Sequence, residues 1–119
     1  MLPEGFVTRM RTLLGAEFDA FLASYDLPRN LGLRLNPLKT DVPPALDAFG
    51  LRPVPWAENG YYYDPQTRPA LSAYHDAGLY YLQEPSAMAP AGLLEARPGE
   101  RVLDLCAAPG GKSTQLAAA

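Results

Sequence analysis

The spacing of apolar residues predicts two short helices at the start of the chain. The first begins near Pro3 and ends at Gly15, because proline suits a first helical turn and glycine a C-terminus. Its apolar residues share one face: Phe6, Met10, Leu13 and Leu14. A second helix over residues 17–25 is expected to bury its own apolar residues, Phe18, Phe21 and Leu22.

The pattern then changes to alternation, which is typical of strands. Leucines alternate with other residues over 31–36, which predicts a half-buried strand ended by Pro37. Arg34 falls opposite the leucines, so we expect it on an ordinary exposed polar face rather than on RNA. Three further elements are expected before residue 75: a helix over 43–49, an edge strand over 51–56 and, after an Asn-Gly turn, a strand over 61–63.

A second region is expected from residue 76 onward. Residues 79–83 are predicted to be extended, and a helix begins at Pro85 with Met88, Leu93 and Leu94 as its apolar face. Pro90 fits that helix only in a first turn. A turn over 97–100 then leads to a buried strand over 102–105 and to a helix from Lys112.

Composition narrows the function classes. The 119 residues carry 48% hydrophobic residues and a net charge of −3, with no basic run, which argues against an autonomous nucleic-acid binder. One cysteine excludes an intrachain disulfide, and no signal peptide or membrane span is evident. We therefore expect a cytoplasmic chain without membrane contact, and we assign no metal ligand, including His75.

The segment 102–114 combines the predicted strand, a loop of small residues and the first turn of a helix, and can point N–H groups at an anionic or zwitterionic ligand. One interpretation is a nucleotide phosphate loop, because residues 111–113 fit the second half of that motif. However, Cys106 occupies the position of the first glycine, and Pro109 lacks an N–H. The match fails at two demanding positions.

The second interpretation is the S-adenosylmethionine loop of Rossmann-like methyltransferases. That loop needs an acidic residue after its first strand, which Asp104 supplies, and small residues at alternate positions, here 106, 108 and 110. The helix start can favour the carboxylate of the ligand. We favour this interpretation, with seven cofactor-binding residues: Cys106, Ala107, Ala108, Pro109, Gly110, Gly111 and Lys112.

Three stretches carry a closer resemblance. Residues 98–112 (PGERVLDLCAAPGGK) resemble the first motif of the Nol/Nop/Sun family of RNA cytosine-C5 methyltransferases, and residues 78–87 (GLYYLQEPSA) resemble the stretch before its catalytic core. Residues 33–39 (LRLNPLK) are similar to its upstream R-x-N strand. The run 55–63 and the helical start are similar to the bacterial branch that modifies 16S ribosomal RNA.

This resemblance implies the fold and the chemistry. It implies a small mixed α/β accessory domain over 1–75 that presents RNA, followed over 76–119 by the start of a Rossmann-like class I methyltransferase domain. The enzyme would be a monomer that transfers a methyl group from S-adenosyl-L-methionine to C5 of cytosine in RNA, with 16S rRNA or the small ribosomal subunit as partner. The family adds a thiolate to C6 and uses two cysteines far downstream of the loop. Neither is present here, so we expect an N-terminal fragment that is inactive alone and has no catalytic residue of its own.

Simpler roles compete for the individual residues. We expect Cys106 to pack as a small hydrophobe and Asp104 to cap the loop through backbone N–H groups. The tyrosines at 61–63, 80 and 81 are expected in the core or on the sheet surface rather than stacked on bases. Two other function classes stay open: a P-loop-like nucleotide-binding protein and a non-enzymatic RNA-interaction module.

Overall fold

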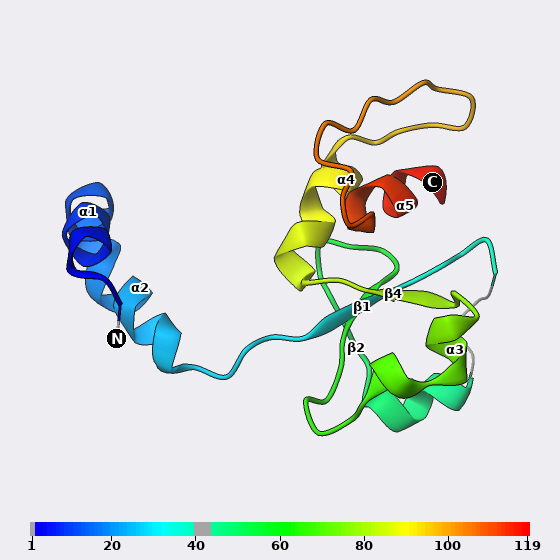
Figure 1. Ribbon diagram of the computed structural model, residues 1–119, viewed down its shortest axis with the longest axis horizontal. Helices are drawn as coiled ribbons and strands as arrows, with labels where there is room; N and C mark the ends of the chain where they lie inside the picture. Colours follow the sequence, from blue (N-terminus) through cyan, green and yellow to red (C-terminus); the bar gives the residue numbers. More distant parts are fainter. Residues whose placement is uncertain (1, 40–43) are drawn as a thin grey trace.

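The computed structural model describes residues 2–39 and 44–119, and it places two helices apart from a small sheet (Figure 1). Helix α1 spans Glu4–Leu14 and α2 spans Phe18–Ala23, with 3-10 turns η1 (Gly15–Glu17) and η2 (Ser24–Asp26) beside α2. Gly15 ends α1 with a φ of 51°, as its position in the sequence predicts. The two predicted helices are confirmed.

The helical pair holds together through aromatic side chains. Phe18 is 2% exposed, and the ring of Phe21 lies 6.2 Å from that of Phe6 and 5.4 Å from that of Tyr25. The expected burial of Leu22 is wrong, because its side chain is exposed, as is that of Leu13 on the apolar face of α1. The pair stands away from the sheet in Figure 1, so none of the sheet's strands or the helical segments described beside them covers it.

The sheet has four antiparallel strands in the order β2-β3-β1-β4. Their bounds are Gly32–Leu35 (β1), Arg52–Pro53 (β2), Gly60–Tyr62 (β3) and Tyr80–Leu82 (β4). The proline-containing strand lies at an edge, as predicted, since proline cannot donate to a ladder. Leu33 pairs with Tyr61 on one side and with Leu82 on the other, which fixes β1 as a central strand.

Short helical segments cover the sheet. These are η3 (Pro44–Phe49), η4 (Pro69–Leu71), α3 (Ala73–Asp76), η5 (Pro85–Met88), α4 (Ala89–Leu93) and α5 (Gly111–Ala117). Pro43, with which we expect the third helix to begin, lies outside the described residues. Pro90 sits in the first turn of α4, as expected. Within the described residues, no helix combines the length and apolar character needed to cross a bilayer.

One core lies against the face of the sheet that carries the leucines of β1. Leu33, Leu35, Leu46 and Tyr80 are at most 3% exposed, and the Tyr80 hydroxyl donates to the Pro69 carbonyl at 2.7 Å. A second cluster combines Val54, Ala57 and Met88.

The central strand β1 is buried on both faces, so the expected exposed polar face is wrong. Arg34 is only 6% exposed. Its face of the sheet is covered by α5, an element 77 positions further along the chain at Gly111. Alternation predicts exposure of every second residue only where one face of the sheet meets water.

Two expectations for the second region need correction. Leu93 and Leu94 are exposed rather than part of an apolar packing face, whereas Met88 is fully buried as predicted. The predicted buried strand over 102–105 is absent: these residues form no strand, and Leu103 and Leu105 are 81% and 85% exposed. A strand needs a neighbouring strand for its hydrogen bonds, and Figure 1 shows this segment in an open excursion between α4 and α5.

Strand β4 lies beyond the domain boundary that we expect near residue 75, yet it pairs with β1 in the same sheet. The sheet therefore physically joins the two predicted regions. The position of the boundary stays a prediction.

Candidate functional site

The loop between residues 104 and 112 is closed by one carboxylate. Asp104 accepts a hydrogen bond from the backbone N–H of Cys106 at 2.8 Å and from the Ser113 hydroxyl at 2.6 Å. These two donors, the hydroxyl first, lower the pKa of Asp104, and the nearby Lys112 adds to the effect. The predicted capping role of Asp104 is confirmed.

The residue just before helix α5 is a glycine in an unusual backbone conformation. Gly110 has a φ of 117°, which residues with a side chain rarely adopt. Its carbonyl accepts from the backbone N–H of Thr114 at 2.9 Å and from the Thr114 hydroxyl at 2.8 Å. The sharp turn into α5 therefore depends on glycine at this position.

The loop keeps several backbone donors free. Across the described part of the chain, we find no acceptor for the amides of Ala108, Gly111 and Lys112, whereas residues 105–106 and 108–109 lie in turns. Pro109 has no N–H, and the amide of Cys106 is occupied by Asp104. The predicted site residues thus provide available donors on both sides of one proline.

Two side chains of the predicted site border an open hollow. Cys106 is exposed, so its expected packing role is wrong, and it lies with Lys112 at a depression of about 310 Å³. The depression is lined by Pro90, Ala91, Leu94, Val102, Leu103, Asp104, Leu105, Cys106, Lys112 and Leu116. Most of the lining residues are apolar. Leu103 and Leu105 among them are exposed, so the depression is open to solvent.

Arg34 of β1 holds the other side of the loop. Its guanidinium donates to the Gly111 carbonyl at 2.7 Å, to the Thr114 hydroxyl at 2.8 Å and to the side-chain carbonyl of Gln115 at 3.2 Å. A fourth bond, of 2.7 Å, goes to the side-chain carbonyl of Gln83, just after β4. Burial lowers the pKa of Arg34 to about 10, which leaves the side chain a cation at neutral pH.

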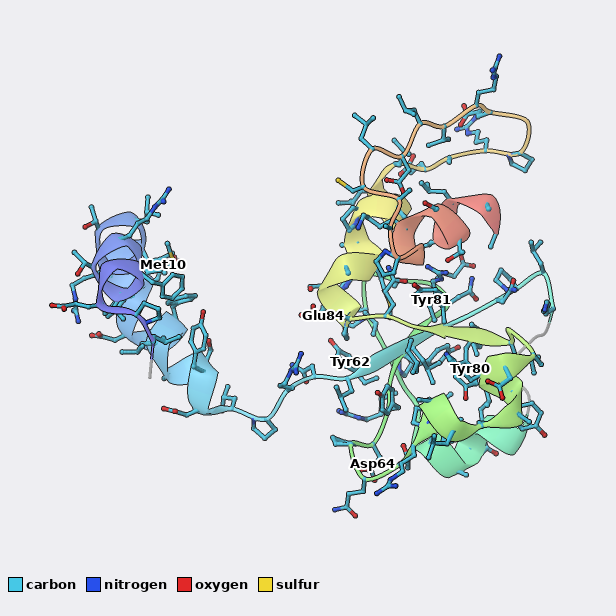
Figure 2. All side chains as sticks on the ribbon, in the orientation of Figure 1. Met10, Tyr62, Asp64, Tyr80, Tyr81 and Glu84 are labelled. Carbon is cyan, nitrogen blue, oxygen red and sulfur yellow. The ribbon has the colours of Figure 1, made fainter. Side chains whose placement is uncertain are left out.

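Gln83 and Tyr81 complete this contact between sheet and loop. Gln83 accepts from Arg34 and donates to the Ala87 carbonyl at 3.0 Å, so both ends of its amide are used. A Cβ atom at Gly111 would lie 3.3 Å from the Gln83 side chain. The Tyr81 hydroxyl donates to the Pro109 carbonyl at 3.1 Å, and Figure 2 shows this tyrosine between β4 and α5.

The remaining tyrosines belong to the sheet. Tyr80 is 3% exposed, and Tyr61, Tyr62 and Tyr63 are half-buried, in line with the core and surface roles expected for them. The sequence patterns indicate no part in the site for Arg34, Gln83 or Tyr81. One sequence signal could have indicated this contact. It is the combination of an arginine between leucines expected in the core and a glutamine in a predicted strand.

The chain is similar to known proteins over nearly its whole length. The family of N-terminal domains of the 16S rRNA methyltransferase RsmF matches residues 2–85. The small-subunit ribosomal RNA methyltransferase F of Escherichia coli O1:K1 / APEC is 38% identical over 98% of this chain, and that of Citrobacter koseri is 40% identical over the same share. The chain spans 27% of the length of either relative.

A solved structure agrees with the sequence matches. The crystal structure of a methyltransferase homolog from Pyrococcus horikoshii superimposes with a TM-score of 0.80 at 31% identity. The match covers 98% of this chain and 40% of that one. The small mixed α/β architecture described above is thus also found in a methyltransferase structure.

Proposed function

The chain belongs to the family of N-terminal domains of the 16S rRNA methyltransferase RsmF, and from this premise we propose that it serves S-adenosylmethionine-dependent methylation of C5 of cytosine in 16S rRNA. The observation that carries the proposal is the group of free amides at Ala108, Gly111 and Lys112, next to a carboxylate-closed turn. The names of the relatives support methylation of small-subunit ribosomal RNA, whereas C5 of cytosine and the cofactor come from the resemblance of the loop and its neighbouring stretches.

The residues present fit this cofactor. Small side chains at Ala107, Ala108 and Gly110 leave the backbone accessible, and the free amides can donate to the carboxylate of the methionine end. Asp104 holds the two ends of the loop together, because it accepts from the Cys106 amide and from the Ser113 hydroxyl. When bound, S-adenosylmethionine supplies an electrophilic methyl group; these residues bind and orient it.

We assign no catalytic residue to this chain. Cys106 is exposed and its amide is fixed by Asp104, but it lies within the proposed binding loop itself. The resemblance implies that the attacking thiolate comes from a different, downstream cysteine. The 119 residues alone are therefore proposed to be inactive.

The proposed division of labour follows the chain. Residues 1–75 serve as an accessory domain that presents RNA, and residues 76–119 begin the methyltransferase domain. The partner is 16S rRNA or the small ribosomal subunit, and the enzyme acts as a monomer in the cytoplasm. The sheet that pairs β1 with β4 connects the two parts.

Calorimetric titration of the full-length gene product with S-adenosylhomocysteine tests the proposal. Ala108→Glu places bulk and negative charge on an exposed loop residue, so it should abolish binding without unfolding the protein. Ala73→Glu, on the exposed start of α3, is the matched control and should bind as the wild type does. No binding by the wild type, or equal binding by both variants, contradicts the proposal.

A further inference from the structure

We propose that Arg34 is a positioning residue for the cofactor loop: from the central strand of the accessory sheet, it fixes the first turn of α5 and thereby sets the affinity for S-adenosylmethionine. This inference rests on the proposed function of the loop. Three of its four hydrogen bonds end on Gly111, Thr114 and Gln115, where the loop passes into α5.

The chemistry of the contact favours a positioning role for Arg34 over a role that only attaches α5 to the sheet. Arg34 is 6% exposed, and its four hydrogen-bond acceptors are neutral oxygens. A buried cation without a bonded carboxylate is a costly way to join two elements, and apolar residues of similar volume usually do so at least as well. A guanidinium, however, holds several acceptors in one fixed plane. This property suits the orientation of a helix start.

The carbonyl groups that accept from Arg34 and Tyr81 show which part of the loop is oriented. Gly110, whose φ of 117° produces the turn, lies between two carbonyl groups held by the sheet. Tyr81 holds the carbonyl of Pro109, and Arg34 holds that of Gly111. Because each peptide group is planar, fixing these carbonyls also fixes the planes of the amides that follow them. Those are amides of the proposed cofactor loop.

Gln83 makes the arrangement specific. It fixes one edge of the guanidinium at 2.7 Å and is itself anchored on Ala87. It also packs where a side chain at residue 111 would stand, since a Cβ there would be 3.3 Å from its amide group. Glycine at position 111 therefore allows the Gln83 side chain, and with it the sheet, to lie close to the loop.

The test compares three variants of the full-length gene product. Arg34→Lys keeps the charge, but a single ammonium group cannot span Gln83, Gly111 and Thr114 together. We expect it to raise both the dissociation constant for S-adenosylhomocysteine and the KM for S-adenosylmethionine roughly tenfold, with the KM for RNA unchanged. The peptide that contains α5 should exchange its amide hydrogens faster than in the wild type.

Thr114→Val provides a second variant in case the first fails to fold. It removes one acceptor of Arg34 at an exposed position of α5, together with the hydroxyl's own bond to the Gly110 carbonyl, so we expect about threefold weaker binding of S-adenosylhomocysteine. Tyr80→Phe is the control: it removes a buried hydrogen bond of the same sheet that does not reach α5. It should leave the dissociation constant unchanged.

The outcomes distinguish failure of the positioning role from failure of the proposed function. Wild-type affinity in Arg34→Lys and Thr114→Val, with unchanged exchange in α5, overturns the positioning role while leaving the proposed function intact. Equal weakening by Tyr80→Phe also overturns it, because general loosening of the sheet would then explain the loss. A wild type that binds no S-adenosylhomocysteine overturns the proposed function, whereas the exchange measurement still decides whether Arg34 fixes α5.

Discussion

The hydroxyl of Tyr81 donates a hydrogen bond of 3.1 Å to the carbonyl oxygen of Pro109. The bond ties the edge strand β4 to the residue just before the glycine that precedes α5. The sheet and the proposed cofactor loop thus share a defined contact, although 28 positions separate the two residues.

Tyr81→Phe isolates this contact. The variant keeps the ring beside Arg34, whose guanidinium carbon lies 5.8 Å from the ring centre, and loses only the hydroxyl. Since a typical hydrogen bond contributes about 0.5–1.5 kcal/mol net, we expect up to tenfold weaker binding of S-adenosylhomocysteine. Calorimetry measures the loss, and binding equal to that of the wild type argues against a role of the sheet in shaping the loop.

Gly111→Ala tests the close approach of Gln83. A Cβ atom there would meet the Gln83 side chain at 3.3 Å, so the free energy of unfolding should fall by about 1–3 kcal/mol. Gly5→Ala in α1 is the matched control, because its Cβ would meet nothing within 4 Å. That change should stabilise the protein by at most about 0.5–1 kcal/mol, since alanine has the higher helix propensity and Gly5 lies in the first turn of α1. Urea unfolding distinguishes the two.

Asp104→Asn should remove a pH-dependent contribution to stability. The pKa of Asp104 is lowered from its ordinary value of 3.8, so its carboxylate stabilises the fold at neutral pH. That contribution is complete above the ordinary value and disappears as the pH falls through the lowered value. The difference in free energy of unfolding between wild type and variant should be constant from about pH 7 to about pH 5 and shrink at lower pH.

Ser113→Ala is the companion experiment for Asp104. The Ser113 hydroxyl is the first cause of the lowered pKa, so its removal should move the pKa of Asp104 back toward its ordinary value. Carbon-detected NMR titration of the carboxyl group reports this directly. An unchanged titration would mean that the Cys106 amide alone holds the carboxylate.

Cys106→Ala should leave methyl transfer by the full-length gene product intact. The thiol is exposed and lies in the loop that we propose to bind the cofactor, where a small side chain is required. Alanine meets that requirement, so we expect a rate within about threefold of the wild type. Loss of more than a thousandfold would make Cys106 the nucleophile and contradict our assignment.

Local patterns predicted the two N-terminal helices, the edge position of β2 and the capping by Asp104, because each depends on residues close together in sequence. Proline at the edge strand and glycine after α1 are examples. The errors occur where distant segments decide. Arg34 is buried because α5 covers β1, and Leu103 is exposed because no described strand pairs with its segment. Neither fact is encoded in the spacing of neighbouring residues.

The candidate cofactor loop, residues 106–112, could likewise be predicted only in part. Its composition identified the candidate residues from Cys106 to Lys112, and this assignment stays a prediction. The contacts that hold the loop, from Arg34, Tyr81 and Gln83, are seen only in three dimensions.

Transfer of a radiolabelled methyl group from S-adenosylmethionine to 16S rRNA by the full-length gene product tests the central claim most directly. We predict that label appears on C5 of cytosine, that S-adenosylhomocysteine competes with the methyl donor, and that Ala108→Glu abolishes the transfer while Ala73→Glu does not. Absence of label in rRNA with the wild type, label on another atom, or full activity of Ala108→Glu would contradict the account.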